Sequence, residues 1–403
     1  MISVDFLDKL LDGAVIEWLP LGDVTQYEQP TKFLVAAKNY SDEFETPVLT
    51  AGKTFILGYT DEVDGIYKAS DAPVIIFDDF TTANKWVDFD FKVKSSAMKM
   101  ITSSDESKVL LKYIYYWLNT LPSELVDGDH KRQWISTFVE KKIPIPCPDN
   151  PKKSLEIQAE IVRILDAFTE LTTELTTELT NRKKQYNHYR DQLLSFEDGE
   201  VEWKTLREVA EVRSGWGFPN AEQGRDEGLY PFYKVSDMNI VGNGTTMITA
   251  NNYIDSEAAK RLGIKVAPPG TVIFPKIGAA VATNKKRLLS VAAAYDNNVM
   301  GLIPGNLISS RFLFFWMQTV NLSTLANDSG AVPSIRKSEM EEMLIPVPRP
   351  EEQARIVAIL DKFDALTNSI TEGLPREIEL RQKQYEHYRD LLLSFPRPEA
   401  IEA

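Results

Sequence analysis

The sequence predicts an α+β protein in which two globular, mixed α/β domains are separated by two long, antiparallel, coiled-coil-like helices. The segment RKKQYNHYRDQLLSF at residues 182–196 recurs as RQKQYEHYRDLLLSF at residues 381–395, with twelve of fifteen positions identical. Each copy ends a long stretch whose apolar residues recur at helical spacing. The remaining segments hold short apolar runs broken by Gly, Pro, Asn and Asp, a pattern typical of strands and loops.

The repeat extends beyond these two helical segments. The run KKIPIPCPDNPKKSLEIQAEIVRILDAFTEL resembles EMLIPVPRPEEQARIVAILDKFDAL, and DGAVIEWLPLGDV at residues 12–24 resembles DGEVEWKTLREV at residues 198–209. The chain therefore begins near the end of one repeat unit and finishes near the end of another. A cyclic arrangement explains this order, with the termini meeting and the two halves related by an approximate two-fold axis.

Both long stretches carry the apolar stripe of an amphipathic helix. In the first, apolar residues from Ile161 to Phe196 recur at spacings of three, four or seven, which predicts a helix of about 43 residues, roughly 65 Å long. The second contains Gly373 and Pro375, and proline disrupts helical hydrogen bonding, so we expect a kink near residues 373–375. The predicted parts are a globular domain at 1–150, a helix at 151–197, a second domain at 198–350, a second helix at 351–396 and a tail at 397–403.

Composition limits the class of protein. Cys147 is the single cysteine in 403 residues, which excludes a disulfide framework. Apolar stretches stay below the roughly 18 residues of a membrane span, and the N-terminus lacks a signal peptide's basic region. We therefore expect a soluble, cytoplasmic protein.

The net charge of −14 argues against strong nucleic-acid binding by the chain alone, because phosphate affinity comes from Lys and Arg. The acidic residues are unevenly placed. Residues 1–150 carry 24 acidic and 15 basic side chains, whereas residues 198–350 carry 16 of each. A role on DNA therefore requires local basic loops, a basic partner, or both.

The organisation of the whole chain resembles the specificity (S) subunit of type I restriction–modification systems, of the type IC branch. The resemblance rests on IPVPRPEEQARIVAILDKFDALTNSI, GAVPSIRKSEMEEMLIPVP, RSGWGFPNA and the tandem ELTTELTTEL, which occur in the expected order. It implies that each globular segment is a target recognition domain reading one half of a split DNA site. It also implies that the helices form a spacer and bind two methyltransferase (modification) subunits.

The resemblance further implies a non-catalytic chain in a bacterial defence complex. The adenine-DNA methyltransferase and ATP-dependent endonuclease activities would belong to the assembled complex, which restriction subunits join through the methyltransferase subunits. S-adenosylmethionine, ATP and Mg²⁺ are expected on the partner subunits, and neither cofactor nor metal in this chain. The expected partners are double-stranded DNA and these subunits, with no membrane.

The candidate DNA contacts are polar and basic loop residues, since Arg suits guanine and Asn or Gln suits adenine in the major groove. GDHKRQWIS and GAVPSIRKS form the best-matched pair, because they align when counted back from the IPxP turns, with Gly128 opposite Gly330 and Ser136 opposite Ser338. The alternative is that these side chains only solubilise the surface. The candidates are Asn84, Lys85, His130, Lys131, Arg132 and Gln133 in the first half, and Lys234, Lys276, Asn284, Lys285, Lys286, Arg287, Ser334, Arg336 and Lys337 in the second.

The repeated helical segment supplies the candidate partner surface. Two near-identical surfaces suit two copies of one partner, and Tyr and Arg are favoured at interfaces. The alternative is contact between helices inside this chain, and we expect both on different faces. The candidate residues are Arg182, Lys183, Lys184, Tyr186, His188, Tyr189 and Arg190 in the first copy, and Arg381, Lys383, Tyr385, His387, Tyr388 and Arg389 in the second.

The tandem TTELTTEL at residues 172–179 predicts a ruler. One additional four-residue unit would lengthen a helix by about 6 Å with about 40° of extra rotation, so the same face stays nearly inward. The unread gap between the two half-sites would then grow. The alternative is an ordinary helical turn on a packed stripe.

Other motifs point away from catalysis. The run Gly52-Lys53-Thr54 ends like a phosphate-binding loop, but Pro47 occupies the position of the required glycine. The three histidines lack metal-ligand spacing, and acidic pairs such as Asp78-Asp79 are common by chance. Two further hypotheses stay open: a protein-binding scaffold without DNA readout, and an enzyme acting alone. The bases of either half-site cannot be read from the sequence.

Overall fold

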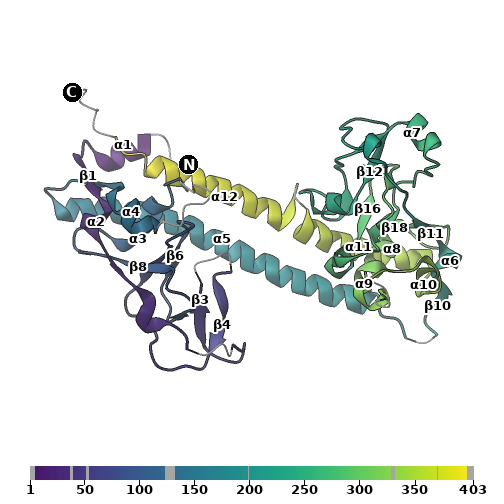
Figure 1. The fold of residues 1–403 in the computed structure, drawn as a ribbon, viewed down its shortest axis with the longest axis horizontal. Helices are drawn as coiled ribbons and strands as arrows, with labels where there is room; N and C mark the ends of the chain where they lie inside the picture. The colour runs from purple at the N-terminus through teal and green to yellow at the C-terminus, as the bar shows by residue number, and fades with distance from the viewer. Residues whose placement is uncertain are drawn as a thin grey trace. The chain divides into compact units, whose positions relative to one another are not determined.

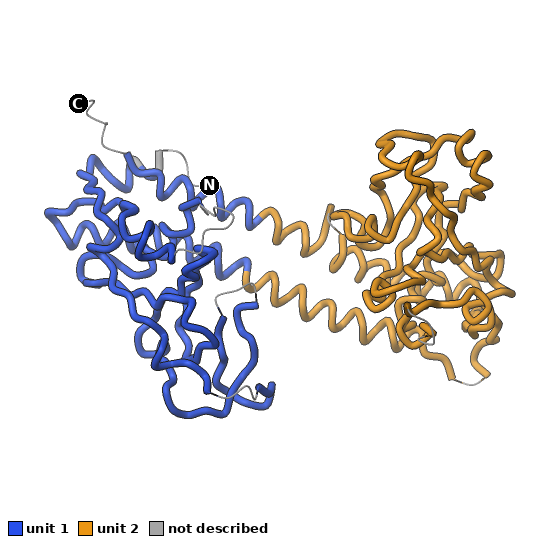
Figure 2. The backbone as a smooth tube through the Cα atoms, in the orientation of Figure 1, with its two compact units in different colours: residues 1–172, 381–403 blue, residues 173–380 orange. Residues whose placement is uncertain are grey.

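The computed structural model describes residues 5–36, 40–50, 54–122, 132–197, 199–327, 332–369 and 371–396. The chain forms two compact units, drawn in different colours in Figure 2. Unit 1 comprises residues 1–172 and 381–403, and unit 2 comprises residues 173–380. The C-terminal segment thus belongs to the same unit as the N-terminal domain, as a cyclic arrangement requires.

Unit 1 is built around a four-stranded sheet in the order β2-β8-β5-β6, with β8 antiparallel to both neighbours. A three-stranded sheet has the order β4-β3-β7, and β1 pairs with β9. The strands are β1 (Ile16–Pro20), β2 (Thr25–Glu28), β3 (Thr46–Leu49), β4 (Ile56–Thr60), β5 (Val74–Asp78), β6 (Asn84–Val87), β7 (Lys92–Val93), β8 (Met98–Ser103) and β9 (Lys142–Pro146). The helices are α1 (Asp5–Leu11), α2 (Leu21–Val24), η1 (Pro30–Phe33), α3 (Leu111–Leu118), α4 (Gln133–Ser136) and η2 (Phe138–Glu140).

Unit 2 has a five-stranded sheet in the order β11-β18-β15-β16-β13, a three-stranded sheet β14-β12-β17 and the pair β10-β19. The strands are β10 (Glu202–Thr205), β11 (Ala210–Ser214), β12 (Tyr230–Tyr233), β13 (Thr246–Met247), β14 (Tyr253–Ile254), β15 (Val272–Pro275), β16 (Arg287–Leu289), β17 (Ala294–Tyr295), β18 (Val299–Pro304) and β19 (Leu344–Val347). The helices are α6 (Leu206–Val209), η3 (Asn220–Glu222), η4 (Val235–Asn239), α7 (Ser256–Arg261), η5 (Ala279–Thr283), α8 (Ser310–Thr319), α9 (Leu322–Leu325) and α10 (Lys337–Glu341).

The two units share one core topology. The order β2-β8-β5-β6 in unit 1 corresponds to β11-β18-β15-β16 in unit 2, and the pair β1-β9 corresponds to β10-β19. The central strands β5 and β15 are buried at every position, which explains why VIIFD and VIFP read as apolar runs rather than alternating patterns. The aromatic-rich helices α3 and α8 pack on these central strands. The predicted α+β class, with two mixed α/β domains and long helices, is confirmed.

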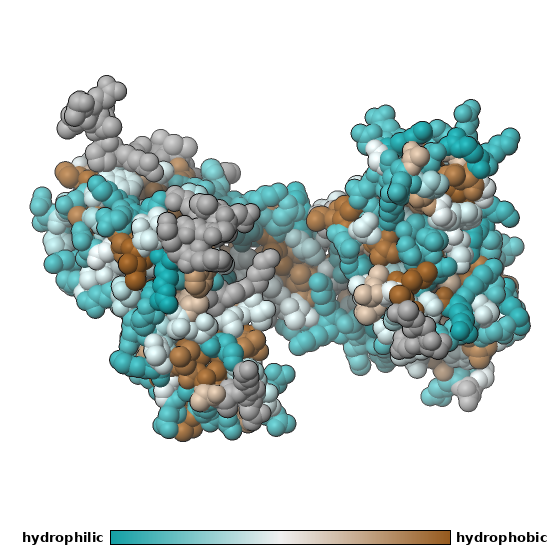
Figure 3. All heavy atoms as spheres, viewed as in Figure 1, coloured by the Kyte–Doolittle hydropathy of each residue, from teal (hydrophilic) through white to brown (hydrophobic). Residues whose placement is uncertain are grey.

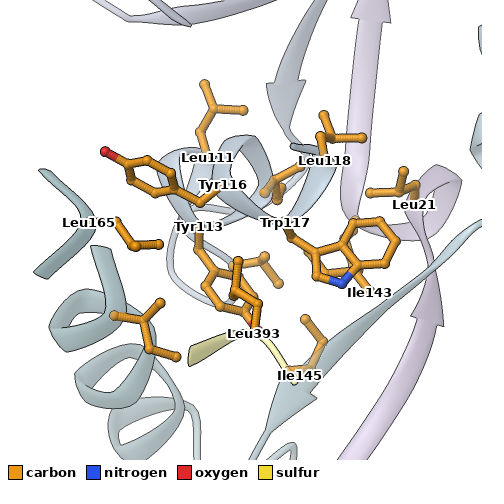
Figure 4. Packing of buried hydrophobic residues seen from close by; sticks show 14 of the residues in the cluster. Leu21, Leu111, Tyr113, Tyr116, Trp117, Leu118, Ile143, Ile145, Leu165 and Leu393 are labelled. Carbon is orange, nitrogen blue, oxygen red and sulfur yellow. The ribbon is translucent and has the colours of Figure 1, made fainter. Parts of the chain in front are cut away.

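The chain's C-terminal end completes the core of unit 1. Leu392, Leu393 and Phe395 are buried in one cluster with residues of α1 and α3. The ring of Phe395 lies edge-on to Tyr113, with centroids 6.5 Å apart, and Figure 4 shows Leu393 beside Tyr113. The Trp18 indole N–H donates to the Pro396 carbonyl at 3.0 Å. Through these contacts the second repeat copy, at the end of the chain, packs into the core of the N-terminal unit.

Three long helices carry the repeated sequences. Helix α5 (Pro151–Leu193) is continuous over 43 residues (Figure 1). The second stretch is divided into α11 (Pro350–Asn368) and α12 (Gly373–Leu392). The break lies just ahead of the expected kink, because Pro375 falls in the first turn of α12, where proline is tolerated.

A buried glutamine at matching positions of α5 and α11 ties each helix to its own unit. In unit 1, the Gln158 side chain accepts from the Leu110 N–H at 2.9 Å and donates to the Lys108 carbonyl at 2.9 Å. In unit 2, Gln353 accepts from the Ser309 N–H and donates to the Leu307 carbonyl, both at 2.9 Å. Each glutamine therefore pairs backbone groups that precede α3 or α8.

Replacing either glutamine is expected to loosen only its own unit. Gln158→Leu leaves two backbone groups without partners, and an unpaired buried polar group costs roughly 1–3 kcal/mol. Hydrogen exchange should become faster in α3 for Gln158→Leu and in α8 for Gln353→Leu. Each variant is the matched control for the other. If one variant accelerated hydrogen exchange equally in α3 and α8, the glutamine would not act on its own unit alone.

Candidate nucleic-acid interface

In unit 1, a buried ion pair organises the end of the central sheet. Asp79 follows β5 directly and is fully buried, with its carboxylate 3.4 Å from the buried Lys99 ammonium of β8. The Lys99 ammonium also lies 5.0 Å from the centroid of the half-exposed Tyr27 ring. The backbone N–H groups of Gln133 and Trp134 donate to Asp79, at 2.9 and 3.1 Å. Asp79 thus fastens the start of α4 to the sheet.

This cluster positions two of the predicted DNA contacts. Arg132 is exposed immediately before α4. When the Gln29 amide is oriented with its oxygen toward the cations, it accepts from Arg132 Nη1 at 3.2 Å and from Lys99. Gln133 is half-buried, and its backbone anchors the turn. The buried Asp79–Lys99 pair thus supports an exposed guanidinium at the end of the sheet.

The other predicted contacts of unit 1 differ in accessibility. Asn84 and Lys85 both lie on β6 rather than in a loop, opposite Phe77 and Ile76 of β5. Lys85 is exposed, whereas the Asn84 side-chain oxygen is buried and has no hydrogen-bond partner among the described residues. His130 and Lys131 lie outside the described residues, as do Gly128 and Gly330.

In unit 2, Lys276 occupies the position that Asp79 occupies in unit 1. It follows β15 directly, and its carbonyl accepts from the Ile335 N–H at 2.8 Å, as the Asp79 carbonyl accepts from Gln133. Gln133 and Ile335 are separated by the same 202 positions as Ser136 and Ser338. The structural match therefore has the register expected from the sequence.

The Lys276 side chain belongs to a small charged group in unit 2. Its ammonium donates to the Ser214 hydroxyl at 3.1 Å, and burial lowers its pKa, opposed by the nearby Asp296 carboxylate. Lys234 donates to Gln223 at 2.5 Å, lies 5.6 Å from the Phe218 ring centroid and also interacts with Asp296. Both predicted lysines thus interact with one carboxylate, whose own pKa is raised by burial.

The predicted run from Asn284 to Arg287 is largely structural. Asn284 adopts a left-handed conformation with φ of 53°, and its side-chain oxygen accepts from the Leu322 N–H at 2.8 Å and the Lys286 ammonium at 2.7 Å. Lys286 is fully buried and also donates to the Val320 carbonyl at 2.5 Å. The prediction that Lys286 contacts DNA is therefore wrong, because its ammonium is enclosed by the fold.

The neighbours of Lys286 are more accessible. Lys285 is half-buried and hydrogen-bonded to Asn239. Arg287 lies on β16 and donates to the carbonyls of Lys286 and Met238, at 2.8 and 3.4 Å. Burial lowers its pKa.

Lys286 leads to a pH prediction. Burial, helped by the Arg190 charge, lowers its pKa to about 7, whereas an unfolded lysine titrates near 10.4. Between these values the unfolded chain binds more protons than the folded chain, so the free energy of unfolding rises with pH. The Tm of the natural chain should therefore rise between pH 7.5 and 9.5 relative to that of Lys286→Met. A Tm difference between the two proteins that does not change with pH would refute this.

The remaining contacts predicted in unit 2 lie around the start of α10. Ser334 is half-buried and forms isolated bridges with Ile277 and Asn327. Arg336 and Lys337 are exposed, with ion pairs to Glu339 and Glu341 at 3.7 and 3.4 Å. Exposed ion pairs of this kind are weak, so both cations can exchange partners.

Each copy of the repeated segment has an inward aromatic stripe and an outward polar stripe. Inward, Tyr189 stacks on Phe363 of unit 2 with centroids 5.5 Å apart, and Tyr388 stacks on Phe168 of unit 1 at 5.2 Å. Of the predicted partner residues, the exposed ones are Lys183, Lys184, His188 and Tyr189 in the first copy, and Lys383 and His387 in the second; Tyr189 keeps an exposed fraction of 44% although it stacks on Phe363.

The exposed fractions of these side chains correct part of the predicted partner surface. Tyr186 and Tyr388 are buried, with exposed fractions of 8% and 6%, so they pack inside the chain rather than face a partner. Tyr385 is half-buried, and burial raises its pKa to about 12. The half-buried cations form local contacts: Arg182 pairs with Glu178, Arg190 with Asp191 and Arg389 with Asp390, each at 2.7 Å, and Arg381 donates to Gln384 at 3.0 Å.

Sequence reasoning missed the buried pair under Arg132. Asp79 belongs to an acidic pair of a kind that is common by chance, and Lys99 lies in a strand whose sequence gives no sign of a buried charge. Their pairing requires the register of β5 against β8, in which Phe77 lies opposite Lys99. The only sequence signal is a charged residue at the end of an apolar run in both halves, Asp79 after VIIFD and Lys276 after VIFP.

Surface hydropathy, the hydropathy of the helices and the grouping of metal-ligating side chains also bear on the class of protein. On the face drawn in Figure 3, hydrophilic residues cover much of the surface, with smaller hydrophobic areas among them. Within the described ranges, no helix is long and apolar enough to cross a membrane. Among the same residues, no group of three or more His, Cys, Asp or Glu side chains could hold a metal ion.

These features define a chain with two α+β domains of one core topology joined by helices that carry a repeated sequence. Comparison with known proteins places such a chain in a family. The family model of the type I restriction modification DNA specificity domain matches residues 16–184 and 199–380. The chain therefore belongs to this family. It is 56% identical over 408 residues to the type I restriction enzyme EcoR124I/EcoR124II specificity subunit of Escherichia coli, with 100% of both chains covered. The Escherichia coli EcoprrI specificity subunit is 31% identical, covering 92% of this chain and 93% of the relative.

Solved structures share the fold at low sequence identity. The type I restriction–modification S subunit from M. genitalium aligns with a TM-score of 0.58 and 16% identity, covering 96% of this chain and 98% of the other. A chain from a structure concerning complex assembly of the type I R-M system aligns with a TM-score of 0.53 and 16% identity, covering 94% and 97%. These likenesses support the two-domain α+β fold.

Proposed function

We propose that this chain is the DNA sequence-specificity subunit of a type I restriction–modification complex. Each unit reads one half of a bipartite DNA site through the major groove, and the connecting helices set the unread gap. The observation that carries the proposal is one core topology with different side chains at equivalent positions. Where unit 1 has Asp79 and Arg132, unit 2 has Lys276 and Ser334. A shared scaffold with unlike side chains at the same end of the central sheet suits two different half-sites.

The repeated segments would dock two methyltransferase subunits, one at each unit. This is supported by the outward stripe, which repeats Lys184 and His188 as Lys383 and His387. The chain itself would be non-catalytic, and S-adenosylmethionine, ATP and Mg²⁺ would bind the partner subunits. The whole assembly would act in the cytoplasm, where restriction subunits join it through the methyltransferase subunits.

Electrophoretic mobility shift tests this proposal. The chain assembled with its methyltransferase subunits should bind a DNA duplex with both half-sites more tightly than scrambled duplexes. The net charge of −14 predicts weak binding without those subunits. Equal binding to all duplexes by the assembled complex would contradict DNA readout and favour a protein-binding scaffold.

A further inference from the structure

Two connections join the units, and each contains a phenylalanine and a tyrosine at equivalent positions of the repeat. These two residues serve as landmarks for comparing the connections. The first runs through α5, with Phe168 in unit 1 and Tyr186 in unit 2. The second runs through α11 and α12, with Phe363 in unit 2 and Tyr385 in unit 1. Phe168 and Phe363 are the stacking partners of the repeated tyrosines Tyr388 and Tyr189, in nearly parallel ring pairs with interplanar angles of 25° and 28°. The landmarks therefore mark equivalent points of the two connections.

The connections differ in length by four residues. Tyr186 follows Phe168 by 18 positions, all within α5, whereas Tyr385 follows Phe363 by 22 positions. Four of those positions, 369–372, lie between the end of α11 at Asn368 and the start of α12 at Gly373. The helical parts of the two connections therefore have equal length, about 27 Å for 18 residues.

The described residues between α11 and α12 are Ser369, Thr371 and Glu372, and they hydrogen-bond to one another. The Ser369 hydroxyl accepts from the N–H groups of Thr371 and Glu372, at 3.3 and 3.2 Å. Gly373 has φ of 75°, and a Cβ there would lie 2.4 Å from the Ala365 carbonyl oxygen. Only glycine fits this close approach at positive φ. The chain is therefore held in a conformation that ends α11 and restarts the helix.

We propose that residues 369–372 compensate for the difference in length between the two connections. Because these four residues lie outside the helices, the number of helical residues between the landmarks is the same in the second connection as in α5. This inference rests on the proposed function, because it assigns the length of the DNA gap to α5 alone. Both connections run between the same two units, and α5 is one continuous helix without a turn in which to store residues. The length of α5 would therefore determine the length of the unread DNA gap, and the second connection would have no separate effect on it.

The test compares two variants in complex with the methyltransferase subunits. The insertion variant carries one extra Thr-Thr-Glu-Leu unit after Leu179. The deletion variant lacks residues 369–372 and carries Gly373→Ala and Pro375→Ala, because proline would otherwise lie inside a continuous helix. Its second connection then has 18 positions between the landmarks, as α5 has. Sequencing of methylated adenines in treated DNA reports the gap for each complex.

The insertion is expected to lengthen the gap, and the deletion to leave it unchanged. A deletion variant that shortens the gap, or that no longer assembles and methylates, would overturn the inference, since the four residues would then do more than absorb length. An insertion that leaves the gap unchanged would instead overturn the proposed role of the helices. The two failures are therefore distinguishable.

Discussion

One additional Thr-Thr-Glu-Leu unit in α5 is expected to shift methylation to sites whose unread gap is longer by one to two base pairs, with both half-sites unchanged. Four helical residues add about 6 Å, and B-DNA advances about 3.4 Å per base pair. The added rotation beyond a full turn is about 40°, so the apolar stripe stays nearly in place. Leu171, Leu175 and Leu179 already follow this four-residue spacing.

The measurement is methylation of a duplex library in which the gap between the half-sites varies. The natural chain is the reference, and Thr177→Ala, which changes the same part of α5 without changing its length, is the control. An unchanged gap preference after the insertion would contradict the ruler. Altered half-sites would show that the insertion had disturbed the recognition domains instead.

Placing carboxylates in the outward stripe of one repeated segment is expected to remove one methyltransferase subunit from the complex. Lys184→Glu with His188→Glu affects the copy in unit 2, and Lys383→Glu with His387→Glu affects the copy in unit 1. All four side chains are exposed, so the fold should tolerate the changes. Desolvating unpaired carboxylates at an interface costs several kcal/mol, enough to weaken binding by a hundredfold or more.

Native mass spectrometry measures the resulting stoichiometry. Each paired variant should give a complex with one methyltransferase subunit, and the combination of both should give none. Lys152→Glu, an exposed charge reversal on α5 outside residues 182–196, should retain two subunits. If the combined variant also retained two, the docking surface would lie elsewhere.

The helical framework was predictable because its signals are local and repeated. Apolar spacing from Ile161 to Leu193 sets the inward face of α5, and the order of the repeats places the C-terminal copy with the N-terminal unit. The position of the helix break was less predictable. Pro375 predicts a helix break at its own position. Proline is tolerated in the first turn of a helix, however, and the break lies before Gly373.

The candidate site was less predictable, because accessibility depends on contacts between distant segments. Lys286 lies in a basic run, yet the Val320 carbonyl and the left-handed Asn284 enclose its ammonium. Asp79 and Lys99 meet only through strand pairing. By contrast, the register of Gln133 against Ile335 follows from counting back to the shared IPxP turns, a local signal.

Sequencing of methylated adenines in DNA from cells that express this chain with its methyltransferase subunits tests the central claim most directly. The account predicts one motif with two different specific half-sites separated by a run of unread bases of constant length. A contiguous motif without a gap, or methylation independent of sequence, would contradict two separate reading domains on a helical spacer.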